Sequence, residues 1–190
     1  DVDLSRTGGW FTAIFPVLLT CPTSGDPGET IRSIKEQLRR IPRHGINYGV
    51  LRYLGRAPRL QAEISAWPPA EVRFNYLGQL DQALAPAGFF RSARESSGPA
   101  YDPRNRRTVL MEINSIVVDG RLQVGWTWCQ DTHQRDTVAR LAESYLAVLQ
   151  ALSAHCLAQK TVAYTTSDFP QAALRQDELD ALVHDILEPT

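Results

Sequence analysis

The segment TVLMEINSIVVDGRLQVGWTWC, residues 108–129, contains two apolar runs that are joined by Asp119-Gly120. An Asp-Gly pair between alternating apolar runs is a strong signal for a β-hairpin, because both central turn positions need positive φ. The sequence therefore predicts two antiparallel strands, at 108–118 and 121–129.

The hairpin and the sequence after it provide apolar faces that can pack together. On the first strand, alternation gives one face with Met111, Ile113 and Ser115 and another with Glu112, Asn114 and Ile116. Trp126 and Trp128 share a face of the second strand. Apolar residues then recur at helical spacing, which predicts a long helix with a buried stripe. The stripe consists of Val138, Leu141, Tyr145, Val148, Leu149 and Leu152.

A further strand is predicted upstream, at 71–77, and it leads into the string FNYLGQ at 74–79. Alternation puts Phe74 and Tyr76 on one face and Asn75 on the other. The residues alone leave two interpretations open. In one, Asn75 forms hydrogen bonds with a neighbouring loop, while Phe74 and Tyr76 belong to the hydrophobic core. In the other, its amide holds a thioester or pantetheine amide, or steadies negative charge on an oxygen, beside a cavity.

The N-terminal part predicts one strand and one helix. Residues 10–20, WFTAIFPVLLT, are typical of a buried strand in which Pro16 marks an edge or a bulge. Asp26 then begins a helix as its N-cap, and Pro42 ends it. One side of this helix is basic, with Arg32, Lys35, Arg39 and Arg43. With the elements above, this order predicts an α/β fold, an α+β sandwich whose mixed sheet has helices packed on one face.

Composition and short motifs exclude several classes of protein. Hydrophobic residues make up 43%, charged residues 22%, and the net charge of −1 argues against a general nucleic-acid binder. The sequence contains no apolar run of about 18 residues, so it predicts no membrane span. No phosphate-binding glycine motif, GxSxG elbow or metal-ligand spacing occurs. The three widely separated cysteines favour a reducing cytoplasm.

Charge is distributed unevenly along the chain. Residues 31–60 carry eight basic side chains against one acid, Glu36, and residues 171–190 are acidic. This asymmetry indicates surfaces with different neighbours, or it reflects two solvated helix faces.

Three strings together carry a family resemblance. They are SRTGGWFTAIFPV at 5–17, PRHGINYG at 42–49 and FNYLGQ at 74–79. In this order they resemble the RTVGWFT, PxxGxGYG and FNYLGQ blocks in the C-terminal half of nonribosomal peptide synthetase epimerization domains, relatives of the condensation domains. Gly8 stands where Val is usual, and Asn47 departs from the second block, although Asn tolerates a left-handed backbone.

The resemblance implies a lobe of the chloramphenicol acetyltransferase type. The expected lobe is 1–160, and 161–190 is expected to be a linker with a short acidic helix toward a following condensation domain. In such domains the FNYLG loop lines a substrate tunnel, which favours Asn75 and Tyr76 as tunnel residues. Trp10 would shape the tunnel wall or simply be buried. Arg6 would anchor a carboxylate or phosphate, or form a salt bridge to the other lobe.

The resemblance also implies the chemistry and the partners. The family inverts the α-carbon of an aminoacyl or peptidyl thioester, carried on the phosphopantetheine of a peptidyl carrier domain. No cofactor is bound directly. The family's HHxxxDG motif and upstream Glu are absent from this sequence, so we expect no catalytic residue here and no activity without the N-terminal lobe. An acidic carrier would dock on basic residues, namely Arg39, Arg43, Arg104, Arg106 and Arg107.

Two other functions stay open from the sequence. The chain resembles, more distantly, a lobe of a peptide-bond-forming condensation domain. It is also compatible with a non-catalytic module that docks carrier domains.

Overall fold

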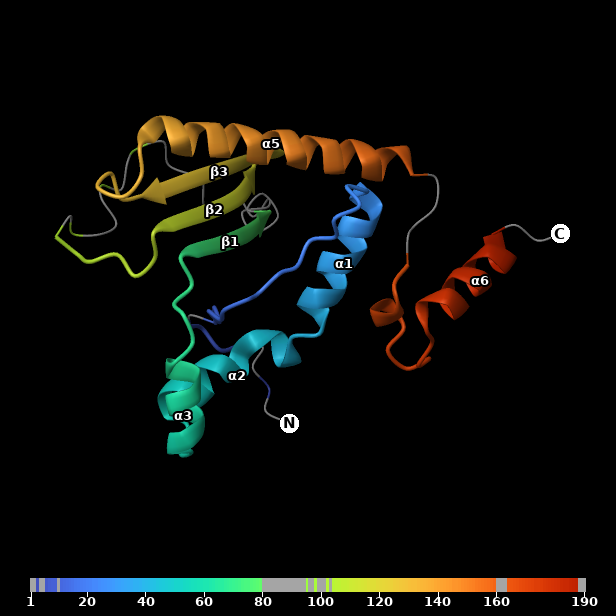
Figure 1. Cartoon of the computed structure of the whole chain (residues 1–190), viewed down its shortest axis with the longest axis horizontal. Coiled ribbons are helices and arrows are strands. Elements are labelled where there is room, and N and C mark those ends of the chain that lie inside the picture. The colour runs from blue at the N-terminus through green and yellow to red at the C-terminus, as the bar shows by residue number, and fades with distance from the viewer. Residues whose placement is uncertain are drawn as a thin grey trace. The chain divides into compact units, whose positions relative to one another are not determined.

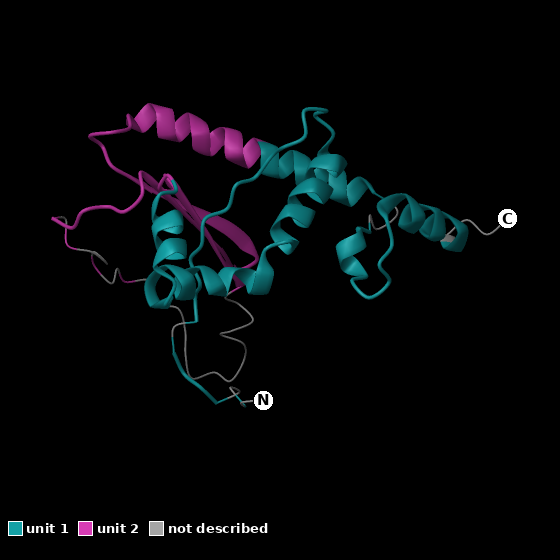
Figure 2. Cartoon of the chain, turned by 60° about the horizontal axis from the view of Figure 1, so that its bottom comes forward, with its two compact units in different colours: residues 1–67, 148–190 teal, residues 68–147 magenta. Residues whose placement is uncertain are grey.

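The computed structural model describes residues 3, 6–9, 11–79, 95, 98, 102, 104–159 and 164–187 of the 190-residue chain. The chain divides into two compact units (Figure 2). Unit 1 comprises residues 1–67 and 148–190, and unit 2 comprises residues 68–147. Most of the segment 81–105, whose Gly and Pro content predicts a long loop, lies outside the described residues.

Unit 2 is built on a mixed three-stranded sheet (Figure 1). Its order is β1 (Val72–Gln79), β2 (Met111–Val118) and β3 (Arg121–Trp128). Strands β1 and β2 are parallel, whereas β2 and β3 are antiparallel. The predicted hairpin is confirmed, because Asp119 and Gly120 have φ of 51° and 66° and connect the two strands.

The core of unit 2 lies between one face of this sheet and helix α5 (Arg135–Ala158). Met111, Ile113 and Val138 are buried there, and Trp126 packs edge-on against Tyr145 with ring centroids 5.7 Å apart. The predicted division of β2 into two faces is therefore confirmed.

The buried stripe predicted for α5 is only partly present. Val138 is 2% exposed, but Leu141 and Val148 are 47% and 59% exposed. A 24-residue helix is about 36 Å long, whereas an eight-residue strand spans about 26 Å. The helix therefore extends beyond the sheet, and the sheet cannot cover its whole apolar stripe. Leu141 instead lines an open cavity of about 330 Å³, where Val72 and Leu110 also lie.

Helix α5 is the one described helix that is long and apolar enough, by length and composition, to cross a membrane. Core helices of soluble proteins meet the same criterion. In this structure Val138 and Tyr145 of α5 pack against the sheet.

Unit 1 is mostly helical, and its first helix is α1 (Pro27–Arg39), which confirms the predicted helix. Asp26 caps α1 by accepting hydrogen bonds from the backbone N–H groups of Gly28 and Glu29. Its other elements are η1 (Pro42–Gly45), α2 (Ile46–Gly49), η2 (Val50–Leu54), α3 (Pro58–Ser65), η3 (Thr166–Asp168) and α6 (Gln176–Leu187). The short acidic helix predicted near the C-terminus corresponds to α6.

The strand predicted at 10–20 is wrong for residues 11–20, which form no strand and are mostly exposed. A strand requires a hydrogen-bonded neighbour, and no described strand pairs with this segment. Two other contacts hold it. Thr20 exchanges two backbone hydrogen bonds with the Gln37 side chain, both 2.8 Å. The ring of Phe15 packs on Gly45, where an added Cβ would lie 2.1 Å from Phe15 Cδ1.

Candidate functional site

The string FNYLGQ lies in β1, and its side chains alternate as the sequence predicts. Phe74 pairs with Ile113 on the face that α5 covers, and Tyr76 pairs with Ser115 on the same face. Phe74 and Tyr76 are 57% and 52% exposed, so neither belongs to the buried core. The interpretation of these two rings as core residues is therefore wrong.

Asn75 lies on the opposite face, in register with Asn114 of β2, which is in register with Gly125 of β3. We call Asn75, Asn114 and Gly125 the amide row. The Asn75 Nδ2 group donates a hydrogen bond to Asn114 Oδ1 at 3.3 Å. Both asparagines are half-buried and Gly125 is exposed. The amide row therefore presents carboxamide groups on the face that α5 does not cover.

An ion pair borders the amide row. Arg73 Nη1 lies 3.7 Å from Glu112 Oε1, and Arg73 Nη2 donates a hydrogen bond to Thr108 Oγ1 at 3.0 Å. These contacts tie β1 to β2 beside the asparagines and help to fix the register of the two strands.

The pairing of β1 becomes irregular directly after Tyr76. The register shifts between Tyr76 and Gln79, and Gly78 has a φ of 82°. A glycine adopts this left-handed backbone without a steric penalty. The chain therefore bends at Gly78, and the regular ladder ends beside Asn75 and Tyr76.

The other predicted tunnel residues are not part of the amide row. Arg6 lies in an exposed turn of unit 1, and Trp10 lies outside the described residues. Arg6 and Asn75 thus belong to different compact units.

The arginines predicted to dock a carrier are split between the two units. In unit 2, Arg104 forms a bidentate pair with Asp102 at 3.0 and 2.6 Å, and Arg107 Nη2 donates to the Thr127 carbonyl at 3.1 Å. Arg106 is exposed. In unit 1, Arg43 is exposed with a left-handed φ of 49°.

Arg39 has a structural contact that the sequence did not predict. The turn η3 lies against α1, where Asp168 accepts from Lys35 Nζ and Arg39 Nη1, both at 2.5 Å. Ser167 Oγ donates to Glu36 Oε1 at 2.5 Å. We call the contacts of Thr165, Ser167 and Asp168 with α1 the linker clasp. The Lys35 ammonium, with the Thr165 backbone N–H, holds the pKa of Asp168 well below its ordinary value.

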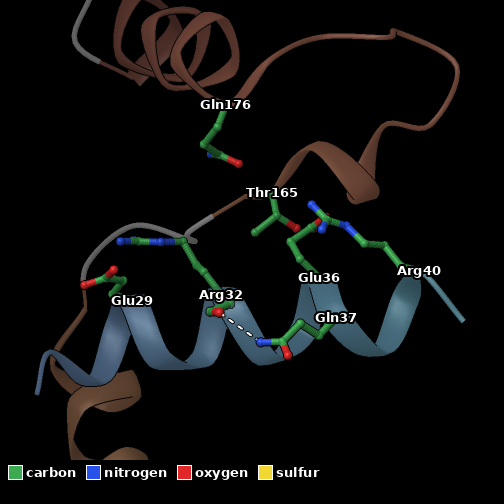
Figure 3. Close-up of a pocket in the computed structure, with 8 residues that line it drawn as sticks. Glu29, Arg32, Glu36, Gln37, Arg40, Thr165 and Gln176 are labelled. Atoms are coloured by element: carbon green, nitrogen blue, oxygen red, sulfur yellow. Dashed lines mark hydrogen bonds between the residues drawn. The ribbon is translucent and has the colours of Figure 1, made fainter. Parts of the chain in front are cut away.

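A cavity of about 310 Å³ lies beside the linker clasp, as Figure 3 shows. Glu36 of α1 and Arg40, the C-cap of that helix, lie close to Thr165, which is 1% exposed. The sequence did contain a signal for this turn, because Thr165 and Asp168 have capping-box spacing, and both reciprocal hydrogen bonds are present.

The amide row can bind an oxygen but cannot by itself move a proton. Carboxamide N–H groups donate to a carbonyl or to an oxygen that gains negative charge. Among the residues that the structure describes, no group of three His, Cys, Asp or Glu side chains could hold a metal ion. Hydrogen bonding from the Asn75 and Asn114 carboxamides is what the amide row itself supplies.

Comparison with known proteins identifies the family. The condensation domain model matches residues 1–175. The chain belongs to the condensation domain family. It is 40% identical over 178 residues to a linear gramicidin synthase of Brevibacillus parabrevis, and 40% identical over 181 residues to chondramide synthase cmdD of Chondromyces crocatus. These matches cover 94% and 95% of this chain but only 2% and 4% of the two relatives.

A solved structure confirms the fold of this condensation-family chain. The epimerization domain from the third module of tyrocidine synthetase B matches with a TM-score of 0.73 at 33% sequence identity. The match covers 84% of this chain and 34% of that one. The chain is a C-terminal lobe of the condensation superfamily from a nonribosomal peptide synthetase, and the predicted mixed α/β fold of the chloramphenicol acetyltransferase type is confirmed.

Proposed function

We propose that this lobe forms one wall of the substrate tunnel in an epimerization domain. The domain would invert the α-carbon of an aminoacyl or peptidyl thioester held on the phosphopantetheine of a peptidyl carrier domain. The RTGGWFT and FNYLGQ strings support this branch of the family, as does the likeness to a solved epimerization domain. The reaction is assigned to the complete domain, of which this lobe is one part.

The single observation that carries the proposal is the amide row. Removal of the Cα proton sends its electron pair into the thioester carbonyl, and the oxygen gains negative charge. Return of a proton to the opposite face of Cα completes the inversion. Asn75 has one N–H bonded to Asn114, and its second N–H, which has no hydrogen-bond partner among the described residues, can donate to that oxygen. A donor held on a strand stabilises the charge without having to reorganise.

The groups that move the proton are assigned to the N-terminal lobe of the same domain. Asn75 and Tyr76 would contact the substrate from this side, while a base and an acid act on the two faces of Cα. We therefore propose that this lobe alone has no epimerase activity.

The test uses the intact synthetase module with an aminoacyl group loaded on its carrier. Asn75→Ala should slow Cα–H exchange with solvent deuterium by about 10²- to 10³-fold, the loss typical when one oxyanion donor is removed. Gln123→Ala, an exposed change on the same face of the sheet, should leave the exchange rate unchanged. Exchange by Asn75→Ala at the parent rate would exclude Asn75 from the reaction.

A condensation domain is the second candidate, because the matching family model is the condensation model. The chirality of the carrier-bound product separates the two functions. A D-configured thioester supports epimerization, whereas a new peptide bond with no inversion supports condensation. Carrier binding with neither reaction would support a docking module.

Carrier docking at the exposed arginines is a separate part of the proposal. Arg106 and Arg107 precede the start of β2, and reversing both charges should weaken binding of an acidic carrier domain. Isothermal titration with the phosphopantetheinylated carrier measures this directly. Unchanged affinity would remove these residues from the docking surface.

A further inference from the structure

Gly125 and Asn114 have no role in the sequence motifs, yet they complete a row across the sheet with Asn75. We propose that Asn114 is a positioning residue that orients the Asn75 amide, and that Gly125 keeps a slot open beside the pair for the acyl group of the substrate. This inference rests on the proposed function, since it assigns the surroundings of the same site.

Asn114 controls which group Asn75 presents. The terminal torsion of an asparagine side chain is broad and roughly two-fold, so an unrestrained Asn75 would present its oxygen and its N–H groups interchangeably. The hydrogen bond from Asn75 Nδ2 to Asn114 Oδ1 at 3.3 Å selects one orientation. The second N–H of Asn75 then has a fixed direction, as stabilisation of an oxyanion requires.

The position of Asn114 in the sheet suits this role. It lies on β2, the central strand, which is paired on both sides through the residues in register with Asn114. The ion pair between Arg73 and Glu112 holds the neighbouring part of the ladder. A side chain on a rigid central strand can orient a partner more accurately than one on a loop.

Nothing among the described residues requires a glycine at position 125. Its φ is not left-handed, and the register of β2 and β3 is regular around it, so no bulge requires it. Of the residues that the structure describes, a Cβ at this position would meet the backbone oxygen of Asn114 alone, at 3.8 Å, which is ordinary van der Waals contact. Glycine in the middle of a strand is unfavourable unless another group approaches the backbone closely. We therefore assign the bare backbone of Gly125, beside Asn114, to the approach of the acyl group.

A double-mutant cycle in the intact, carrier-loaded synthetase module tests Asn114. Asn114→Ala should lower the rate constant for Cα–H exchange by about tenfold while the KM for the loaded carrier stays the same. Because Asn114 acts through Asn75, the double variant should exchange no more slowly than Asn75→Ala alone. The positioning role would be overturned if the two substitutions slowed exchange by factors that multiply in the double variant. It would also be overturned if Asn114→Ala exchanged at the parent rate.

Gly125 is tested in the same module by a series of increasing size. Gly125→Val should preserve or raise the Tm, since Val favours strands, and should raise the KM or abolish exchange because its side chain fills the slot. Gly125→Ala should have an intermediate effect. Full exchange activity in Gly125→Val would overturn the proposed role of Gly125. A lower Tm in Gly125→Ala would overturn it as well, because it would show that folding requires the glycine.

These outcomes are distinct from failure of the proposed function. If the parent module shows no Cα–H exchange and no D-configured product, the epimerase assignment fails. If the parent exchanges and Asn75→Ala exchanges at the same rate, Asn75 takes no part in the reaction. If Asn75→Ala is damaging while the Asn114 and Gly125 variants behave like the parent, only the further inference fails.

Discussion

The linker clasp of unit 1 and the amide row of unit 2 are both partly buried polar clusters, but they use their hydrogen bonds differently. Asp168 accepts from Lys35, Arg39 and the Thr165 backbone N–H, so the carboxylate is occupied by groups of the chain itself. Within the part of the chain that the structure describes, the amide row has one hydrogen bond, between its two carboxamides. Donors without an internal partner on a half-buried surface indicate binding, whereas a fully bonded cluster indicates a structural role.

Two glycines show the same contrast. Gly45 is covered by Phe15 and has a φ of +77°, so both packing and backbone require it. Gly125 has neither constraint. Unit 1 uses its glycine to bring two of its own segments together, and we assign the glycine of unit 2 to the approach of a ligand.

The largest effect on stability should come from adding a methyl group at Gly45, where the Phe15 ring packs. Gly45→Ala places a methyl group 2.1 Å from the Phe15 ring and forces a left-handed alanine, and it should lower the free energy of unfolding by about 3 kcal/mol. Gly25→Ala is a matched control, because Gly25 has a φ of +73° and nothing within 4 Å. It should cost about 1 kcal/mol. Urea unfolding of both variants separates the clash from the backbone strain, and equal losses would contradict the packing argument.

The second effect concerns the linker clasp. Asp168→Ala leaves Lys35 and Arg39 without their shared carboxylate. It should lower the free energy of unfolding by about 1 to 2 kcal/mol, because Asp168 and Lys35 are partly buried whereas the exposed Arg39 contributes little. The linker should also become more sensitive to limited proteolysis near residues 164–169. Cα–H exchange in the intact module should be unaffected. A large loss of exchange with an intact linker would mean that the clasp takes part in function.

Local patterns in the sequence were sufficient to predict the elements whose partners are nearby in the chain. The Asp119-Gly120 hairpin and the alternation in FNYLGQ depend on turn geometry and a period of two, and both are confirmed. Asp26 and the helix it caps follow from neighbouring residues in the same way.

Predictions that required a distant partner were less successful. Residues 11–20 have the composition of a strand, but composition does not supply a neighbouring strand, and they form none. Asn114 was assigned to a face of β2, yet its contact with Asn75 depends on pairing between strands 39 positions apart. The contact between Asp168 and Lys35 spans 133 positions, and no local pattern encodes it.

A pH titration sharpens the contrast between the two clusters. The folded pKa of Asp168 lies below its unfolded value, so its stabilisation is present above about pH 4 and is lost as the pH falls through the lower folded pKa. Asp168→Asn should therefore be less stable than the parent at about pH 6, and the difference should shrink toward about pH 3. Chemical unfolding at both pH values measures it, and all other carboxylates cancel in the comparison. A constant difference would show that the charge of Asp168 does not contribute.

The smallest effect should come from Gln37, which joins residues 11–20 to α1. Its carboxamide both accepts from and donates to the Thr20 backbone at 2.8 Å, but the pair is exposed, so water replaces these hydrogen bonds readily. Gln37→Ala should lower the free energy of unfolding by about 0.5 to 1 kcal/mol. It should also speed hydrogen exchange at the Thr20 amide, while amides of β2 keep their protection. Gln37→Glu retains the acceptor for the Thr20 N–H but loses the donor to its carbonyl, so Thr20 should exchange at an intermediate rate. If Thr20 exchanges equally in all three proteins, the Phe15 contact with Gly45 alone anchors the segment.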